Sequence, residues 1–404
     1  MTDMSTIPAF PATRAPGCPF EPPAEFSELR DNDAITQASC PAGIDAWVVS
    51  RYEDVRNVLS TPSVSSRKAP SAHVTPGADL ERPITPGNIL QLDGKEHARL
   101  RRLLTPEFTV RRMEALRPYI QQLVEEHIDA MLAGPQPADL YQAFALPIPS
   151  LVICEMLGVP YEDREVIHEH SATLMAVDRD PAIGFAAYGQ VQAYMTTLFE
   201  TKLANPGDDL IGRMITRGRE SGDQITAAEM VELAITLLIA GHETTANMIA
   251  LSTAALLQQP EKLAELRDNP ELAPTAVEEM LRYLSVVQFG LLRYATEDVQ
   301  IGEQTVKAGE WLVAAIGSGN RDEQVYAEAD SIDLARKAKT HLAFGFGIHQ
   351  CLGQQLARIE LQEVYARLFR RIPTMRLAID ADEISFKDNA LVYGVHELPV
   401  TWEG

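Results

Sequence analysis

A single cysteine inside a glycine-rich segment carries the clearest chemical signal in this sequence. Residues 344–353 read Phe-Gly-Phe-Gly-Ile-His-Gln-Cys-Leu-Gly, so Cys351 stands directly before a predicted helix over residues 354–371. Gly345 and Gly347 allow a tight turn or a close approach of the backbone. A thiolate near a helix N-terminus is stabilised by free N–H groups and the helix dipole, and haem iron can take one such thiolate as axial ligand. A lone cysteine is more often a buried structural residue, but this spacing favours a ligand.

A second candidate site lies in the middle of the longest helical pattern, residues 226–259, where residues 240–245 read Ala-Gly-His-Glu-Thr-Thr. A glycine inside a helix costs about 0.5–1 kcal/mol relative to alanine, and a flat cofactor or O₂ pressed against Gly241 would offset that cost. Glu243 and Thr244, an adjacent acid and alcohol, can relay protons. The alternative is a kinked core helix with a solvated glutamate, because threonine can bond back to a helix carbonyl.

The start of that motif, His-Glu, also resembles the zinc sequence His-Glu-x-x-His. The second histidine of a zinc site would stand at position 246, which is Ala246. We therefore reject a zinc protease. The helix itself has a clear beginning, because Thr226 and Glu229 form a capping-box signature. About 33 residues rising 1.5 Å each predict a helix of roughly 50 Å.

The composition narrows the class of protein. The chain has 404 residues, 46% of them apolar, which is typical of a globular protein. A formal net charge of -22 argues against general binding to nucleic acid. The cysteines are too few and too scattered for a disulfide framework, which favours the reducing cytoplasm; they are Cys18, Cys40, Cys154 and Cys351. Residues 1–20 contain no apolar run and residues 233–241 are too short to span a bilayer, so we expect neither signal peptide nor membrane anchor.

From about Trp47 to the C-terminus the chain resembles the cytochromes P450, a family of haem-thiolate monooxygenases, and most of all their soluble actinobacterial members. The segment 344–353 matches the haem-binding signature of that family at every fixed position, and residues 240–245 match its oxygen-activation motif. The resemblance implies a mainly α fold with a small β region, formed by one domain over residues 1–404. We expect an irregular, proline-rich arm over residues 1–40, a long central helix over 226–259, and the cysteine loop with its following helix over 344–371.

The family further implies haem b as the cofactor, with Cys351 as the proximal iron ligand. Thr244 would hydrogen-bond the oxygen molecule at the iron, and Glu243 would feed protons toward it. Cations are needed for the two haem propionates, and guanidinium groups suit carboxylates. The resemblance assigns this role to His97, Arg101, Arg293 and His349, although each could be an ordinary surface base. It also assigns haem contacts to Ala240, Gly241, Phe344, Gly345, Gly353 and Ala357.

Glu279 and Arg282 stand three residues apart on a predicted helix over residues 274–284. Such a pair is usually a surface ion pair that contributes little. In the family, however, it is a buried structural pair behind the haem, joined by an arginine from a later loop, and Arg336 fits that third member. The loop departs from the family pattern, because Ala329 replaces a common proline and Ile332 a common phenylalanine.

The candidate substrate-lining residues are apolar, which favours a bulky lipophilic molecule such as a polyketide, steroid or terpenoid. By resemblance they are Ile89, Leu90, Leu237, Val287, Phe289 and Val392, with Leu174, Met175 and Phe185 as a possible roof. Each could equally be plain core. The sequence leaves open whether the substrate is hydroxylated or epoxidised.

The sequence contains no flavin or iron–sulfur motif, so the resemblance implies electrons from NAD(P)H through a ferredoxin and a ferredoxin reductase. A basic patch could dock the ferredoxin, or the same bases could be scattered and solvated; they are Arg99, Arg102, Arg111, Arg112, Lys337, Lys339 and Arg358. Two rival functions remain: a peroxide-driven haem-thiolate enzyme and a non-catalytic haem sensor. The acid–alcohol pair Glu243 and Thr244 disfavours both.

Overall fold

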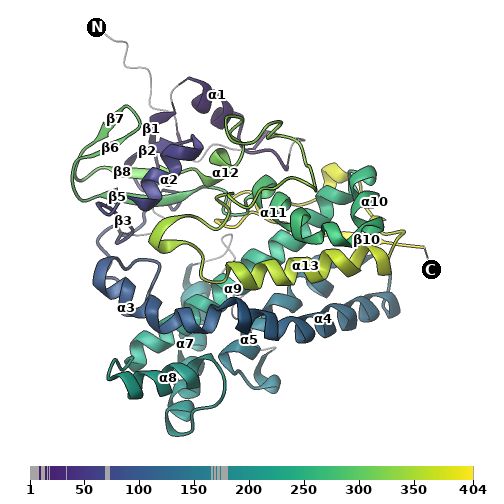
Figure 1. The fold of residues 1–404 in the computed structure, drawn as a ribbon, viewed down its shortest axis with the longest axis horizontal. Coiled ribbons are helices and arrows are strands. Elements are labelled where there is room, and N and C mark those ends of the chain that lie inside the picture. Colours follow the sequence, from purple (N-terminus) through teal and green to yellow (C-terminus); the bar gives the residue numbers. More distant parts are fainter. Residues whose placement is uncertain are drawn as a thin grey trace. The chain divides into compact units, whose positions relative to one another are not determined.

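The chain forms two compact units. The computed structural model (Figure 1) describes residues 9–10, 14–15, 17, 19–32, 34–68, 73–164, 167, 170, 173 and 181–403. The first unit comprises Met1–Ile84, Leu90–Asp93 and Glu278–Cys351, and the second comprises Thr85–Ile89, Gly94–Val277 and Leu352–Gly404. The assignment of residues 1–404 to a single domain stays a prediction.

A five-stranded sheet forms the centre of the first unit (Figure 1). Its strands, in spatial order, are β1 (Ile35–Ser39), β2 (Asp45–Val49), β8 (Trp311–Ala314), β5 (Leu291–Ala295) and β3 (Val64–Ser65). β2 and β8 run parallel, and the other neighbours run antiparallel. The register places Arg293 opposite Leu312, so this arginine is fixed on an interior strand. A separate hairpin joins β6 (Val299–Ile301) to β7 (Gln304–Val306).

Short helices cover the sheet of the first unit. α2 (Tyr52–Ser60) turns its apolar side chains, among them Val55 and Val58, into a cluster with strand residues such as Leu312. α1 (Glu25–Asp31) contributes Phe26 to a second cluster, and α12 (Ile316–Gly319) follows β8. The α1 helix and strand β1 lie within residues 1–40, so the prediction of an irregular arm there is wrong over that part. Packing of Phe26 of α1 and Ala38 of β1 into the second cluster overrides the turn-forming tendency of the prolines nearby.

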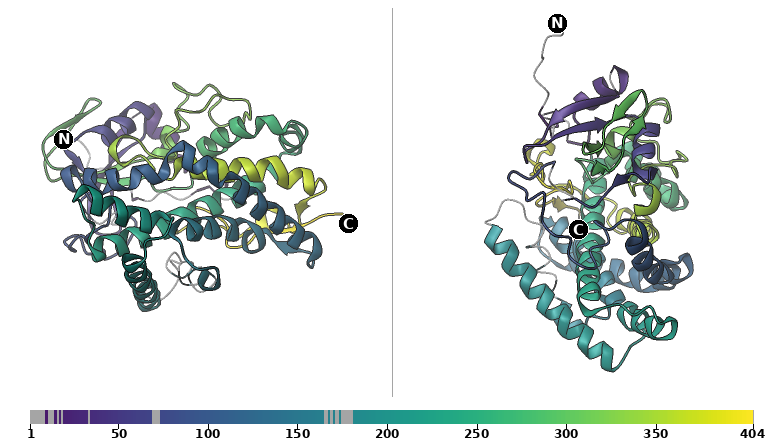
Figure 2. Two further views of the ribbon diagram at one scale, coloured as in Figure 1. Left: turned by 60° about the horizontal axis from the view of Figure 1, so that its bottom comes forward. Right: turned by 90° about the vertical axis from the view of Figure 1, so that its left-hand side faces the viewer.

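Helices dominate the second unit. In chain order they are α3 (Gly94–Leu104), α4 (Val110–Ala133), α5 (Pro147–Leu157), α7 (Pro181–Ala204), α8 (Leu210–Ser221), α9 (Ala227–Leu257), α10 (Pro260–Asp268) and α13 (Gln354–Arg371). α4 lies beside α13 (Figure 1), and α5 and α7 pack against α9 (Figure 2). The chain passes from the second unit into the first within α11 (Ala273–Leu284). Within the described ranges, no helix combines the length and apolar character needed to cross a membrane.

α9 begins as the sequence predicts. The Thr226 hydroxyl accepts a hydrogen bond from the Glu229 N–H at 3.2 Å, and the Glu229 carboxylate accepts one from the Thr226 N–H at 2.9 Å. This capping box satisfies helix N–H groups that would otherwise lack partners. Beyond it the sequence is apolar on nearly every side, which is typical of a buried helix. α9 is therefore a rigid support for the side chains at its centre.

Short segments complete the second unit. η2 (Tyr141–Ala145) precedes α5, and a small sheet orders its strands as β4 (Ala138–Asp139), β10 (Pro399–Thr401) and β9 (Arg376–Leu377). The predicted helices over residues 274–284 and 354–371 are confirmed. Leu174 and Met175, named above as a possible roof, lie outside the described residues.

Candidate functional site

The cysteine loop is closed by hydrogen bonds of its own main chain. The Cys351 N–H donates to the Phe344 carbonyl at 2.8 Å, and the Gly345 N–H donates to the Leu342 carbonyl at 2.7 Å. A single 3₁₀ turn, η5 (Gly347–His349), leads into the cysteine. The Cys351 thiol is half-buried, whereas Cys40 and Cys154 are buried. The loop therefore fixes the backbone of one accessible sulfur, which is what a protein ligand to iron requires.

Gly345 and Gly347 are required in the cysteine loop for different physical reasons. Both have left-handed backbones, with φ of 66° at Gly345 and 75° at Gly347. A Cβ on Gly347 would lie 2.3 Å from the Leu59 carbonyl oxygen of α2, whereas a Cβ on Gly345 would meet only Leu291 Cδ1 at 3.8 Å. Gly347 thus allows the loop to press against α2 in addition to turning. This close approach anchors the cysteine loop to the first unit.

A hydrogen-bonded cluster around Asp93 holds His349, two residues before the cysteine. His349 Nε2 lies 3.1 Å from Asp93 Oδ1 and 3.0 Å from the Ser66 hydroxyl. Asp93 also accepts from the Ser65 hydroxyl at 2.5 Å and the Ser66 N–H at 3.1 Å. Burial alone would raise the pKa of Asp93, but these hydrogen bonds and the His349 charge lower it well below its usual range. Nothing in the sequence distinguished Asp93 from other acids, so the prediction missed it.

Arg293 is a half-buried cation on β5. Its guanidinium donates to the Leu292 carbonyl at 2.8 Å, and in the described part of the chain it forms no ion pair within 4.0 Å. Partial burial lowers the pKa of Arg293 to about 10, although the charge of Asp93 opposes the shift. A guanidinium of this kind is suited to a carboxylate ligand. His97 and Arg101, the other two predicted cations for propionates, stand four residues apart on α3 of the second unit, with His97 buried.

One face of the central part of α9 is accessible, and most other positions there are buried. The accessible face has helical spacing and comprises Thr236, Leu237, Ala240, Gly241 and Thr244, whereas Ile239 is partly exposed away from it. The Thr244 hydroxyl donates to the Ala240 carbonyl at 2.8 Å. This is the back-bonding that the alternative hypothesis allowed, and it also fixes the hydroxyl on the accessible face. The small residues Ala240, Gly241 and Thr244 on this face leave room for a flat group.

The structure gives a packing reason for glycine at position 241 that the sequence did not reveal. A Cβ at this position would lie 3.2 Å from Cδ1 and Cγ1 of Ile153 on α5, tighter than an ordinary contact. The close packing of α5 on α9 therefore accounts for the glycine without any cofactor. The role of Gly241 as a haem contact stays a prediction.

Glu243 is buried in a cluster that unites three distant parts of the second unit. Its Oε1 accepts from Asn247 Nδ2 at 2.8 Å and from Lys387 Nζ at 2.9 Å, and its Oε2 lies 3.4 Å from the Tyr141 hydroxyl. Burial raises the pKa of Glu243, but the charge and hydrogen bond of Lys387, with a hydrogen bond from Asn247, lower it overall. The glutamate is therefore not solvated. The i+4 spacing from Glu243 could have indicated Asn247 as a partner, but no local pattern in the sequence indicates Tyr141 or Lys387.

The Glu279–Arg282 pair is fully buried in the first unit. Nε and Nη2 of Arg282 donate to Glu279 at 2.8 Å, and Arg336 Nε donates to the same carboxylate at 3.1 Å. Arg282 also donates to the carbonyls of Asn320 and Ala329, at 2.8 and 2.7 Å. The contact at Ala329 uses the main chain, so the replacement of the usual proline leaves it in place. The predicted arrangement of Glu279, Arg282 and Arg336 is present.

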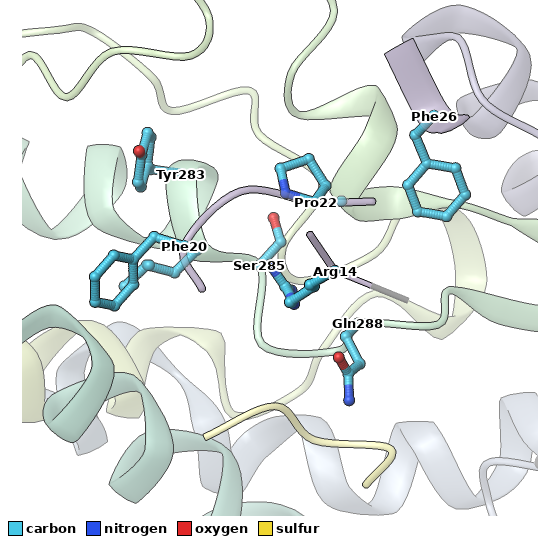
Figure 3. A pocket seen from close by; sticks show the side chains of 9 residues that line it. Arg14, Phe20, Pro22, Phe26, Tyr283, Ser285 and Gln288 are labelled. Carbon is cyan, nitrogen blue, oxygen red and sulfur yellow. The ribbon is translucent and has the colours of Figure 1, made fainter. Parts of the chain in front are cut away.

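A second buried arginine, Arg321, holds the N-terminal segment to the same unit. It donates to Glu21 and Asp330 at 2.9 and 2.7 Å, and its guanidinium lies 3.7 Å from the centre of the Tyr283 ring. A cavity of about 10 Å³ in the same unit is lined by residues that include Phe20, Phe26, Tyr283 and Gln288 (Figure 3). It is too small for a substrate.

The predicted substrate residues do not share one environment. Phe289 belongs to a buried cluster of the first unit, and Val287 packs against the other buried cluster there. Ile89 and Val392 are buried, Leu237 lies on the accessible face of α9, and Leu90 is 54% exposed. Phe185 on α7 is also exposed, at 66%. Their role in binding a substrate stays a prediction.

Several of the bases predicted to dock a ferredoxin are engaged in ion pairs. Arg99 pairs with Glu229 and Asp223, Arg102 lies 3.7 Å from Asp223, and Arg112 lies 4.0 Å from the buried Glu107. Arg358 donates to Gln354 at 3.0 Å. Arg111, Lys337 and Lys339 are exposed. The lysines at 337 and 339 are the more available charges in the first unit.

Known proteins resemble the chain over nearly its whole length. The family model described as Cytochrome P450 matches residues 191–373. Cytochrome P450-SU2 of Streptomyces griseolus is 46% identical over 394 residues, which cover 97% of this chain and 96% of that protein. Pentalenic acid synthase of Streptomyces avermitilis is 45% identical over 407 residues, 99% of each chain. The crystal structure of CYP105P1 in complex with filipin I has a TM-score of 0.91 and 44% identity, covering 98% and 99%. The chain belongs to the cytochrome P450 family.

The family and the fold make the protein a cytochrome P450 monooxygenase with a mainly α fold and a small β region, as the sequence predicted. The family implies a haem-thiolate iron cofactor. The residues present fit that group. The first unit holds a half-buried cysteine and the half-buried cation Arg293, and the second unit has the accessible face of α9.

Proposed function

We propose that this protein binds haem b through Cys351 and inserts one oxygen atom of O₂ into a bulky lipophilic small molecule of secondary or xenobiotic metabolism. The closed cysteine loop carries the proposal, because its main-chain hydrogen bonds hold one accessible sulfur in place. Haem, when bound, supplies the redox chemistry that activates O₂, and an axial thiolate favours cleavage of the O–O bond. Holding the haem, orienting the substrate and supplying protons fall to the protein.

Arg293 is the strongest candidate for a propionate, because its half-buried guanidinium has no ion pair among the described residues and is suited to a carboxylate partner. We assign the same role to His349, held by Asp93, and to His97 and Arg101 on α3. The remaining proposed haem contacts are Ala240, Gly241, Phe344, Gly345, Gly353 and Ala357. Gly353 and Ala357 stand at the start of α13, where the Ala357 N–H donates to the Gly353 carbonyl at 3.0 Å.

We assign proton supply to Glu243 and Thr244. Thr244 presents its hydroxyl on the accessible face of α9, and Glu243 is a buried carboxylate one residue away. A positioned acid or base of this kind contributes about 10²–10⁴-fold to a rate. A peroxide-driven enzyme or a haem sensor has no need for such a pair, so these two functions stay alternatives that the pair disfavours.

The substrate class rests on relatives and on apolar side chains. One relative bears the name pentalenic acid synthase, and another was crystallised with filipin I. We propose that Ile89, Leu90, Leu237, Val287, Phe289 and Val392 line the binding site. Few charges occur among them, which suits a lipophilic molecule.

We further propose that electrons come from NAD(P)H through a ferredoxin reductase and a ferredoxin in the cytoplasm. A net charge of -22 requires a local basic site for an acidic ferredoxin, and the exposed Lys337 and Lys339 offer one. Substitution of both by glutamate should slow reduction by the ferredoxin and weaken its dependence on salt. Equal reduction rates would remove this surface from the proposal.

The carbon monoxide difference spectrum of the dithionite-reduced protein tests the haem assignment. We expect a strongly red-shifted Soret band in the wild type, its loss in Cys351→Ser, and its retention in Cys40→Ala, which changes a buried cysteine outside the loop. A Soret band typical of histidine ligation would overturn the assignment of Cys351. Turnover with NADPH, ferredoxin and reductase, compared with turnover on hydrogen peroxide alone, separates the monooxygenase from the two alternatives.

A further inference from the structure

Lys387 is the one cation in contact with the buried Glu243 carboxylate among the described residues. Its ammonium lies 2.9 Å from Glu243 Oε1, 2.8 Å from the Tyr141 hydroxyl and 3.3 Å from Asn247 Oδ1. It also lies 4.4 Å from the centre of the Tyr141 ring. Three oxygen atoms therefore receive the three N–H groups of the ammonium, which is a fully satisfied arrangement for a lysine. The side chain is 15% exposed, compared with 6% for Glu243.

The C-terminal segment that carries Lys387 is fixed to its surroundings. The Lys387 N–H donates to the Gly394 carbonyl at 2.9 Å, and the His396 N–H donates to the Ser385 carbonyl at 2.9 Å. A Cβ on Gly394 would lie 1.7 Å from Asn247 Oδ1, so this segment touches α9 at the amide that shares the cluster. The position of the ammonium is therefore set by the backbone, and only its flexible stem is free to adjust.

Other ionisable groups near Glu243 cannot replace Lys387. His242 on the same helix is buried, and burial lowers its pKa, so it is neutral at pH 7. The pKa of Tyr141 is raised by burial and by Glu243 itself, so its hydroxyl stays protonated and neutral, and Asp139 nearby is acidic. From α13, the buried Glu360 lies beside Thr245 and adds no positive charge. Without Lys387, burial would dominate and favour the protonated form of Glu243.

We propose that Lys387 is a positioning residue for proton supply: its ammonium holds the Glu243 carboxylate ionised and in one place beside Tyr141 and Asn247. Glu243 can then take up a proton and pass it on toward Thr244 in each cycle. A Glu243 that keeps its proton permanently serves this relay poorly. The inference rests on the proposed role of Glu243 and Thr244.

The first test observes the charge of Glu243 in the resting holoenzyme by infrared spectroscopy. In Lys387→Met we expect the carbonyl stretch of a protonated carboxylic acid at pH 7, and we expect its loss in the double variant with Glu243→Gln. Lys387→Arg keeps the charge and should resemble the wild type. Lys202→Met is the matched control, because Lys202 and Asp209 form another largely buried lysine–carboxylate ion pair in the same unit. Absence of the acid band in Lys387→Met overturns the proposal, whatever happens to activity.

The second test measures the share of NADPH electrons that reach product. We expect Lys387→Met to lower that share about tenfold, because positioned proton transfer contributes about 10²–10⁴-fold, and to raise the solvent isotope effect. Lys387→Arg should restore both values. An acid band without any change in electron use or pH profile would overturn the link to proton supply. If no variant shows a thiolate Soret band, the proposed function fails, while the infrared result still reports whether Lys387 controls Glu243.

Discussion

Two buried glutamates, one in each unit, are held by cations in different ways. In the first unit Glu279 accepts hydrogen bonds from Nε and Nη2 of Arg282, from Nε of Arg336 and from the Asp333 N–H at 3.0 Å. In the second unit Glu243 receives one ammonium and two neutral donors. The planar guanidinium fixes direction as well as charge, whereas the ammonium is a point charge on a flexible stem.

The difference separates a structural carboxylate from an adjustable one. Arg282 has no exposed side-chain surface, and its remaining N–H groups bind the carbonyls of Asn320, Ala329 and Ser331. No part of that network can change without leaving a buried charge or carbonyl unpaired. Lys387 is partly exposed, so its ammonium keeps some access to water. A site that must exchange protons needs the second kind of environment.

Removing Arg282 should give the largest effect. We expect Arg282→Met to lower the free energy of unfolding by about 3–5 kcal/mol, because it leaves a buried carboxylate with one cation and strands several carbonyls. Urea unfolding followed by circular dichroism measures the change. Arg336→Met keeps the two-point Arg282–Glu279 contact and should cost clearly less. Equal losses in the two variants would contradict the view that the paired guanidinium contact dominates the Glu279 network.

The Glu243 cluster can be disturbed from its packing side without touching any charge. We expect Gly394→Ala to cost about 1–3 kcal/mol, because the new methyl group overlaps Asn247 Oδ1 and forces it to move. The same variant should show part of the carboxylic acid band expected for Lys387→Met. Gly189→Ala on α7 is the control, because a Cβ there meets nothing within 4 Å. An unchanged unfolding midpoint in Gly394→Ala would mean that the C-terminal segment is not fixed against α9.

Asp93 is an intermediate case between the two glutamates, since its side chain is 23% exposed and its cation is a histidine. Its folded pKa lies below the value of about 3.9 expected in the unfolded chain, so its contribution to stability is present above that pH and is lost as the pH falls. We expect Asp93→Asn to cost about 1–2 kcal/mol at pH 7, after allowance for solvent screening, and to flatten the stability curve below pH 4. Urea unfolding between pH 7 and pH 3 measures both effects. A curve parallel to that of the wild type would contradict the low pKa.

The parts of the site that lie close together in the sequence were predictable. The cysteine loop, the acid–alcohol pair on α9 and the Glu279–Arg282 spacing each lie within one segment, where spacing alone limits the geometry. The capping box of α9 and the helix over residues 354–371 also follow from local patterns. Resemblance to the family added Arg336, which local spacing could not supply.

The partners that come from distant segments were not predictable. Lys387 is 144 residues from Glu243, and Asp93 is 256 residues from His349. One lysine or aspartate among many carries no local signal, because its environment is created only when the chain folds. Gly241 illustrates the same limit. The sequence alone could not tell whether this helix glycine makes room for a cofactor or, as the structure shows, for the side chain of Ile153 on α5. The prediction of an irregular arm over residues 1–40 failed because a local pattern was followed too closely. Tertiary packing of Phe26 overrode the local preference of this segment for turns.

The smallest expected effect concerns the turn that supports Arg336. Glu328 is exposed and has a φ of 51°, a conformation that strains most side chains, while its carbonyl accepts from Arg336 at 3.3 Å. Asparagine tolerates this conformation, so we expect Glu328→Asn to raise the free energy of unfolding by about 0.5–1 kcal/mol. Glu328→Gln removes the same charge without that tolerance and should leave the unfolding midpoint unchanged. A gain in both variants would attribute the effect to the net charge of -22 and not to the strained turn. A gain in Glu328→Asn alone would show that the Glu279 network keeps its geometry at the cost of backbone strain at Glu328. The Glu243 cluster, in which the cation is a flexible lysine, does not depend on such a strained turn.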